Sequence, residues 1–230
     1  MTTEPAAVPA ANADQAVLDG IAVQDTYQAK VFDVRNDRSL SELDRAEQLT
    51  AMYEQSSQVV QELSADFDSR RHARLAHLEA QIPRDPGITD GTSAADRAVL
   101  LAAFRTALET ARQQNRDQRR QALAEAERYG DDMQRRATLA AAWDDGQGDI
   151  IAEWAGEHLG PQVWQEMQAL RESLSGAGPD RGWRFKAFRA LTRPAEAANL
   201  DVLRQRATRD AELAAREARA ARLARPAYLG

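Results

Sequence analysis

Apolar residues recur every three or four positions along most of the chain, which is the spacing of one face of a helix. The pattern is most regular over residues 41–81, a stretch without Gly or Pro that opens on Ser41, a residue type that caps the first N–H groups of a helix. Residues 14–35 show the same spacing with a thinner apolar face, and the polar run from Asn36 to Ser39 separates the two stretches. The pattern predicts two successive helices.

The longer of these helices would exceed the width of a compact domain. About 40 residues of helix extend about 60 Å, whereas a globular chain of 230 residues is about 35 to 40 Å across. We therefore expect a long antiparallel helical hairpin, coiled-coil-like, which either folds within one chain or forms one arm of an intermolecular coiled coil. The apolar residues expected to form its oligomerisation face are Leu49, Tyr53, Val60, Leu63 and Phe67.

Pro and Gly residues divide the remainder of the chain. After a linker, a third helix is expected to start at Thr92 or Ser93 and to run unbroken to Tyr129, with Gly130 as its stop. Part of its second half, residues 112–120, is almost wholly polar, so we expect it to be exposed or to pair with another segment. Further helices are expected at 131–143, 149–159, 161–174 and 194–225.

The densest apolar cluster of the chain contains Trp143, Trp154 and Trp164, which are expected to form the core of a small Trp-rich helical bundle. The predicted fold is all-α: the long hairpin, this bundle and a basic C-terminal helix. The expected parts are a disordered N-terminus (1–12), an acidic helical hairpin (13–82), a linker (83–93), the bundle (94–174), a hinge (175–182) and a basic C-terminal helical segment (183–230).

Composition agrees with a helical chain and excludes several classes of chemistry. Cysteine is absent, which excludes disulfides, thiolate nucleophiles and thiolate zinc sites. No apolar run approaches the roughly 18 residues that a bilayer span needs. Residues 1–14 carry no basic side chain and no apolar core, so no signal peptide is expected. These features predict a soluble protein.

The net charge of −6 hides an asymmetry along the chain. Residues 1–90 carry a net charge of −8, residues 91–175 carry −4, and residues 176–230 carry +6. A basic tail on an acidic chain is typical of a segment that meets an anionic partner, either an acidic protein surface or nucleic acid.

Candidate catalytic and metal-binding groups are scarce. His72 and His77 are five residues apart, about 140° around a helix, whereas a helical metal pair needs a spacing of three or four. The acidic run from Asp144 to Asp149 does not place its carboxylates as an EF-hand loop requires. We therefore expect no catalytic residue, no metal and no cofactor, and a protein that is not an enzyme.

One basic segment, Arg181 to Arg193, interleaves cations with aromatic rings and contains no acidic residue. Arginine and aromatic side chains dominate protein-binding hot spots, and they also suit phosphate contact with base stacking. The alternatives are a helix that packs its rings on the Trp cluster and leaves its cations in water, a site for an acidic protein, and a site for nucleic acid; a membrane partner is not expected. The candidate partner-binding residues are Arg181, Trp183, Arg184, Phe185, Lys186, Phe188, Arg189 and Arg193.

Two stretches carry a resemblance to a known class of proteins: the turn from Asn36 to Glu42 with Arg45-Ala46 and Met52-Tyr53 after it, and the stretch from Gly148 to Trp154. They resemble small Ala/Arg-rich helical proteins from the structural-gene clusters of tailed phages and prophages of GC-rich bacteria. The overall plan also resembles phage scaffolding proteins, which are acidic, elongated, helical and cysteine-free and engage the coat protein through a basic C-terminal segment.

This resemblance implies a non-enzymatic role in head assembly, as a scaffold or a minor virion component, in the host cytoplasm or the virion. Its implied partners are further copies of the chain and an acidic, coat-like protein. The alternatives are a nucleic-acid-binding accessory or regulatory protein that uses the same basic tail, and a phage effector that acts on a host protein.

Overall fold

The computed structural model describes residues 4–223 and consists of ten α-helices and one short 3-10 helix, with no strand in that range. This confirms the all-α class. The ends of the expected N-terminal and C-terminal parts, residues 1–3 and 224–230, lie outside the described residues. No helix between residues 4 and 223 combines the length and the apolar character needed to cross a membrane.

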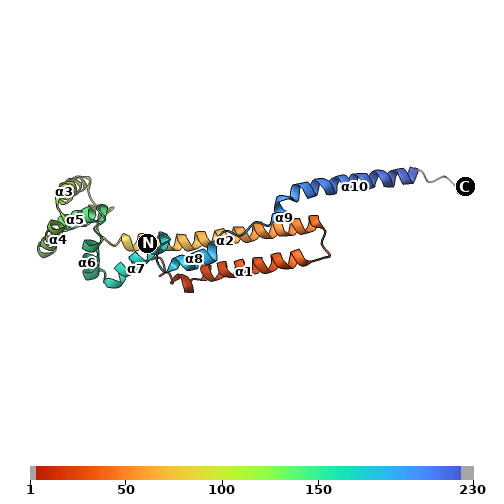
Figure 1. The fold of residues 1–230 in the computed structure, drawn as a ribbon. Coiled ribbons are helices and arrows are strands. Elements are labelled where there is room, and N and C mark those ends of the chain that lie inside the picture. The colour runs from red at the N-terminus through yellow and green to blue at the C-terminus, as the bar shows by residue number, and fades with distance from the viewer. Residues whose placement is uncertain (1–3, 224–230) are drawn as a thin grey trace. The chain divides into compact units, whose positions relative to one another are not determined.

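The chain divides into two compact units, each built from two stretches of sequence (Figure 1). The first comprises residues 1–8 and 70–178, and the second comprises residues 9–69 and 179–230. One division lies inside a long helix rather than at the expected linker 83–93, because Leu78 and Ile82 are buried in the core of the first unit. The other division, after residue 178, lies inside the expected hinge 175–182.

The first unit holds the Trp-rich bundle. Its core joins the end of α2 (Glu42–Glu79) to the bundle helices, with Trp154 buried and Trp143 and Trp164 packed at the edge. Val8 also packs against this core, so the N-terminal stretch expected to be disordered is partly held by apolar contact. The bundle helices are α3 (Ala94–Gln113), α4 (Arg116–Tyr129), α5 (Asp132–Asp144), α6 (Gly148–His158) and α7 (Pro161–Leu174).

The helix expected to run unbroken to Tyr129 is in fact two helices. Gln114 is extended, with φ −79° and ψ 142°, and ends α3. Asn115 then caps α4: its side chain accepts a hydrogen bond from the backbone N–H of Gln118, whose own side chain accepts one from the backbone N–H of Asn115. This reciprocal capping box competes with continued helix, because it satisfies the free donors of a new helix start.

The polar run at 112–120 pairs with an acidic loop. Arg119 is only 1% exposed and donates to the carbonyl oxygens of Ala111 and Ala141, while it forms an ion pair of 2.6 Å with Asp145. The neighbouring arginines pair with carboxylates on either side of this loop: Arg112 with Asp144 at the end of α5, and Arg116 and Arg120 with Asp149 at the start of α6. The acidic run is therefore neutralised by arginines of α3 and α4.

The second unit joins segments from both ends of the chain. Apolar residues of α1 (Gln15–Asn36), α2 and α8 (Asp180–Phe188) form one cluster with the 3-10 helix Ala11–Ala13. Figure 1 shows α8 beside α1 and α2. The last helical stretch, expected at 194–225, is interrupted at Asn199. It forms α9 (Ala195–Ala198) and α10 (Leu200–Leu223).

Candidate protein-docking site

The basic aromatic segment forms α8 and the extended stretch that follows it, and one face of α8 is anchored inside the second unit. Ala187 is fully buried against α1. This close approach depends on Gly20 of α1, where an added Cβ would lie 3.0 Å from the carbonyl oxygen of Ala187 and 3.1 Å from the ring of Phe188. The absence of a side chain at Gly20 therefore lets α8 lie close to α1.

Two further contacts tie α8 to α2. The ring of Phe188 meets that of Phe67 edge to face, with centroids 5.5 Å apart. Arg184 forms an ion pair of 3.0 Å with Asp68, and its guanidinium carbon lies 5.5 Å from the centroid of Phe67. Because Arg184 and Phe188 are one turn apart, these contacts fix the rotation of α8 about its axis.

The chain after α8 is held by hydrogen bonds from α1. The side-chain amide of Gln24 donates a hydrogen bond of 2.7 Å to the backbone carbonyl oxygen of Arg189. The hydroxyl of Tyr27 donates one of 2.8 Å to the backbone carbonyl oxygen of Thr192. Both α1 side chains are buried, and burial raises the pKa of Tyr27 above its ordinary value. The carbonyl groups that follow the end of α8 are therefore satisfied within the unit.

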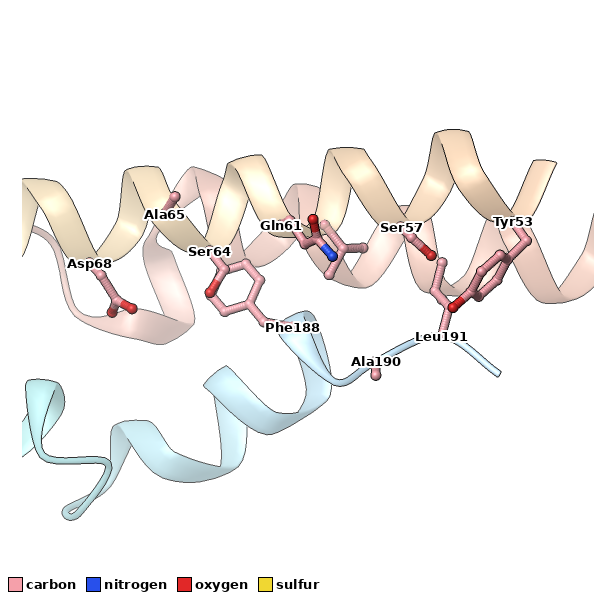
Figure 2. Close-up of a pocket in the computed structure, with 10 residues that line it drawn as sticks. Tyr53, Ser57, Gln61, Ser64, Ala65, Asp68, Phe188, Ala190 and Leu191 are labelled. Carbon is pink, nitrogen blue, oxygen red and sulfur yellow. The ribbon is translucent and has the colours of Figure 1, made fainter. Parts of the chain in front are cut away.

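A pocket of about 400 Å³ opens between α2 and the stretch after α8 (Figure 2). Figure 2 shows Phe188 and Leu191 on one wall and the polar side chains of α2 on the other. The pocket thus has an apolar end and a hydroxyl- and amide-lined wall. Its lining residues are Tyr53, Ser57, Val60, Gln61, Ser64, Ala65, Asp68, Phe188, Ala190 and Leu191.

The other face of α8 carries exposed cations and rings. Phe185 is 68% exposed and Trp183 is 39% exposed, and the ammonium group of Lys186 lies 6.0 Å from the Trp183 ring centroid. Arg181 and Arg189 lie four residues on either side of Phe185 and are also exposed. We name the exposed members of the predicted site the α8 ridge: Arg181, Trp183, Phe185, Lys186, Arg189 and Arg193.

The structure therefore divides the eight predicted partner-binding residues. Arg184 and Phe188 face the interior of the unit, and the other six form the α8 ridge. The ring of Phe188 packs against Phe67 of α2, whereas one sequence interpretation placed the rings of this segment on the Trp cluster.

The residues expected to form an oligomerisation face lie largely inside the second unit. Leu49, Val60 and Phe67 are buried, and Tyr53 and Leu63 are half-buried. Phe67 packs in the cluster shared by α1, α2 and α8, while Tyr53 and Val60 line the pocket. Parts of the same chain therefore cover most of these side chains.

Sequence reasoning missed the α1 residues that hold α8. Gln24 is a polar residue on the apolar stripe of α1, and a buried amide on such a stripe usually signals hydrogen-bond partners nearby. Gly20 lies in the middle of the helix, where Gly is unfavourable unless close packing requires it.

Within residues 4–223, no three His, Cys, Asp or Glu side chains gather as a metal ion would need. The exposed arginines of the α8 ridge can bind carboxylates through paired N–H donors, and its rings can bury apolar area against a partner. Comparison of the chain with protein-family models, with curated proteins and with solved structures found no match.

Proposed function

We propose that this protein is a non-catalytic assembly protein that docks on an acidic protein surface through the α8 ridge and also binds further copies of itself. The observation that carries the proposal is the exposure of Phe185, at 68%, between two exposed arginines one turn away on a helix whose opposite face is anchored. In this proposal α1 and α2 pair as an antiparallel, coiled-coil-like hairpin that supports the ridge.

The chemistry of the ridge supports protein docking. Arginine and large aromatic side chains carry most of the binding energy in protein interfaces. Because Arg184, Ala187 and Phe188 hold α8 in place, the ridge loses little conformational freedom on binding, which favours affinity. Its four basic side chains favour an acidic partner and a contact weakened by salt.

The resemblance to helical phage assembly proteins supports a coat-like protein as that partner. The role would then be in head assembly, as a scaffold or a minor virion component, in the host cytoplasm or in the particle. The polarity of the chain, acidic over its first part and basic over residues 176–230, fits a protein that presents one charged surface to its partner.

The test is titration of the full chain with the major coat protein encoded in the same genome. Phe185→Ala combined with Trp183→Ala is expected to weaken binding by about tenfold or more, and raised salt is expected to weaken it further. Val99→Ala is the matched control, because Val99 is 67% exposed on α3 and lies outside the ridge. Equal affinity for the wild type and the double variant would contradict the proposal.

Nucleic acid is the competing partner, because exposed rings and arginines also suit base stacking and phosphate contact. A DNA duplex and a single-stranded RNA serve as probes under the same conditions. If log affinity for either falls steeply with log salt, and loss of Arg181 and Arg189 flattens that slope, then the ridge serves nucleic acid instead.

A further inference from the structure

Helix α10 has an apolar stripe that continues beyond its contact with the rest of the unit. Leu200 is buried, Leu203 and Ala207 are half-buried, and every residue from 208 to 222 is exposed. The spacing of three and four residues nevertheless persists through the exposed part. We name this continuation the α10 stripe: Ala211, Ala214, Ala218 and Ala221.

An open groove between α1 and α2 offers an apolar floor to such a helix. It has a volume of about 420 Å³, and its floor includes Ala22 and Val23 of α1 with Met52 and Val59 of α2. We name it the α1–α2 groove. The residues that line it are Asp19, Ala22, Val23, Thr26, Tyr27, Lys30, Met52, Gln55, Ser56 and Val59.

The stripe matches the groove in length and in side-chain size. From Asp19 to Lys30 the groove follows α1 for eleven residues, or about 16 Å, and the stripe from Ala211 to Ala221 extends about 15 Å. Alanine side chains let a third helix approach two packed helices closely, as in a three-helix bundle. Within one chain the stripe is exposed and the groove is open, so the stripe does not occupy the groove of its own chain.

Charge favours this pairing over the pairing of two α10 helices. Residues 9–69, which include α1 and the groove-lining part of α2, carry twelve acidic and four basic side chains, whereas α10 carries six arginines and four acidic side chains. Two α10 helices would bring like charges together, while α10 on the α1–α2 surface brings opposite charges together.

We propose that the α10 stripe of one copy lies in the α1–α2 groove of a second copy. This proposal rests on the self-association in the proposed function and names the surfaces that carry it. It uses neither α8 nor the ridge. Because the helix and the groove are different surfaces, one contact leaves the groove of the first copy and the stripe of the second copy free, and further copies add at these free surfaces.

Helix geometry sets the direction of α10 in the groove. Successive residues turn by about 100° around a helix, so Asp210 and Arg222 flank the stripe on opposite sides. If α10 runs parallel to α2 of the second copy, Asp210 comes over Lys30 of α1, and Arg222 comes over Glu62, one turn beyond Val59 on α2. The reverse direction brings Asp210 toward Asp19, a like charge.

The first test uses charge reversal in the full chain, with mass measured by light scattering over a range of concentrations. The wild type is expected to exceed its monomer mass of 25.4 kDa increasingly as concentration rises. Lys30→Glu and Asp210→Lys are each expected to weaken association by about fivefold or more, and their combination is expected to restore it. Glu212→Lys, on the opposite side of α10, is the control for net charge.

The second test mixes two blocked variants that are each confirmed as helical by circular dichroism. Val59→Arg blocks the groove and Ala214→Trp blocks the stripe, so each variant alone is expected to be monomeric. Their mixture retains one good groove and one good stripe, and is expected to give a species of twice 25.4 kDa and nothing larger.

The outcomes separate this inference from the proposed function. If the wild type associates but the charge-reversed pair fails to restore association, or the mixed variants stay monomeric, the α10 assignment is wrong while self-association stands. If the wild type remains monomeric at every concentration, both self-association and the α10 assignment are wrong. Docking through the α8 ridge is measured separately and is unaffected by either result.

Discussion

The hydroxyl of Tyr27 on α1 donates a hydrogen bond of 2.8 Å to the backbone carbonyl oxygen of Thr192, 165 residues later in the chain. Together with Gln24, which donates to the carbonyl oxygen of Arg189, it holds the stretch after α8 against α1. The position of the α8 ridge therefore depends on side chains near the other end of the sequence.

Replacement of Tyr27 by Phe is expected to lower the free energy of unfolding by about 1 kcal/mol, because the partly buried carbonyl of Thr192 loses its donor. Urea unfolding at neutral pH measures this. Thr26→Val serves as a control, since Thr26 is exposed on the same helix and is expected to change stability by less than about 0.5 kcal/mol.

The same tyrosine predicts a loss of stability at alkaline pH. Burial raises the pKa of Tyr27 above its ordinary value of 10.0, so the folded state disfavours the phenolate. The contribution of Tyr27 to the free energy of unfolding is fully present below pH 10 and is lost as the pH rises through the higher pKa of the folded state. Unfolding curves at pH 9 and 11 should show a smaller decrease for Tyr27→Phe than for the wild type; equal decreases would contradict this assignment.

Gly20 and Gly156 form a matched pair of glycines within helices. Gly20→Ala places a methyl group 3.0 Å from the carbonyl oxygen of Ala187, and this overpacking is expected to cost about 1–3 kcal/mol. Gly156 on α6 has no atom within 4 Å of an added Cβ, so Gly156→Ala is expected to stabilise the protein by about 0.5–1 kcal/mol. Thermal unfolding monitored by circular dichroism should show a lower melting temperature for Gly20→Ala and a higher one for Gly156→Ala.

Arg119 is expected to be the arginine of the first unit most sensitive to substitution. Arg119→Met removes the donor to the carbonyl oxygens of Ala111 and Ala141 and the partner of Asp145, at an expected cost of about 2–4 kcal/mol. Arg119→Lys is not expected to rescue stability, because an ammonium group lacks the planar set of donors. Arg105→Ala, exposed on α3, is the control, and an equal loss in it would contradict the assignment.

Acid is expected to weaken the contact of α9 with α1. Arg35 donates two hydrogen bonds, of 2.8 and 2.9 Å, to the carboxylate of Glu196 and lowers the pKa of that group below its ordinary value of 4.5. The stabilisation is present above pH 4.5 and is lost as pH falls through the lower folded pKa. Since the pair is partly exposed, it is worth at most about 1 kcal/mol. Arg35→Ala should reduce the acid sensitivity measured between pH 5 and 3 by urea unfolding.

Local sequence was sufficient to predict where most helices start and stop. Ser41 accepts a hydrogen bond from the backbone N–H of Asp44, Ser93 accepts one from that of Asp96, and Pro161 begins α7. Gly130 ends α4 with φ 71°. Each of these signals depends on residues within one turn of the helix end, so the sequence alone contains the information.

The break at Gln114 and Asn115 was missed although its signal is also local. The spacing of apolar residues predicts where a helix is present better than where it is interrupted. The capping box of Asn115 and Gln118 lies within a polar run, where no apolar residue marks the break. The same run illustrates a second limit. Whether this polar run is exposed or paired depends on the loop near Asp145. Only the packing of the helices brings that loop to Arg119.

The candidate site could be found from sequence as a set of residue types, but its orientation could not. The basic and aromatic residues between Arg181 and Arg193 identified the segment as a candidate site, because the residue types of a segment can be read directly from its sequence. Which of them are packed and which are exposed was decided by Gly20, Phe67 and Asp68, which come from helices far away in the chain. Helical periodicity defines faces, whereas tertiary packing between distant segments determines which face is covered and which remains free to bind.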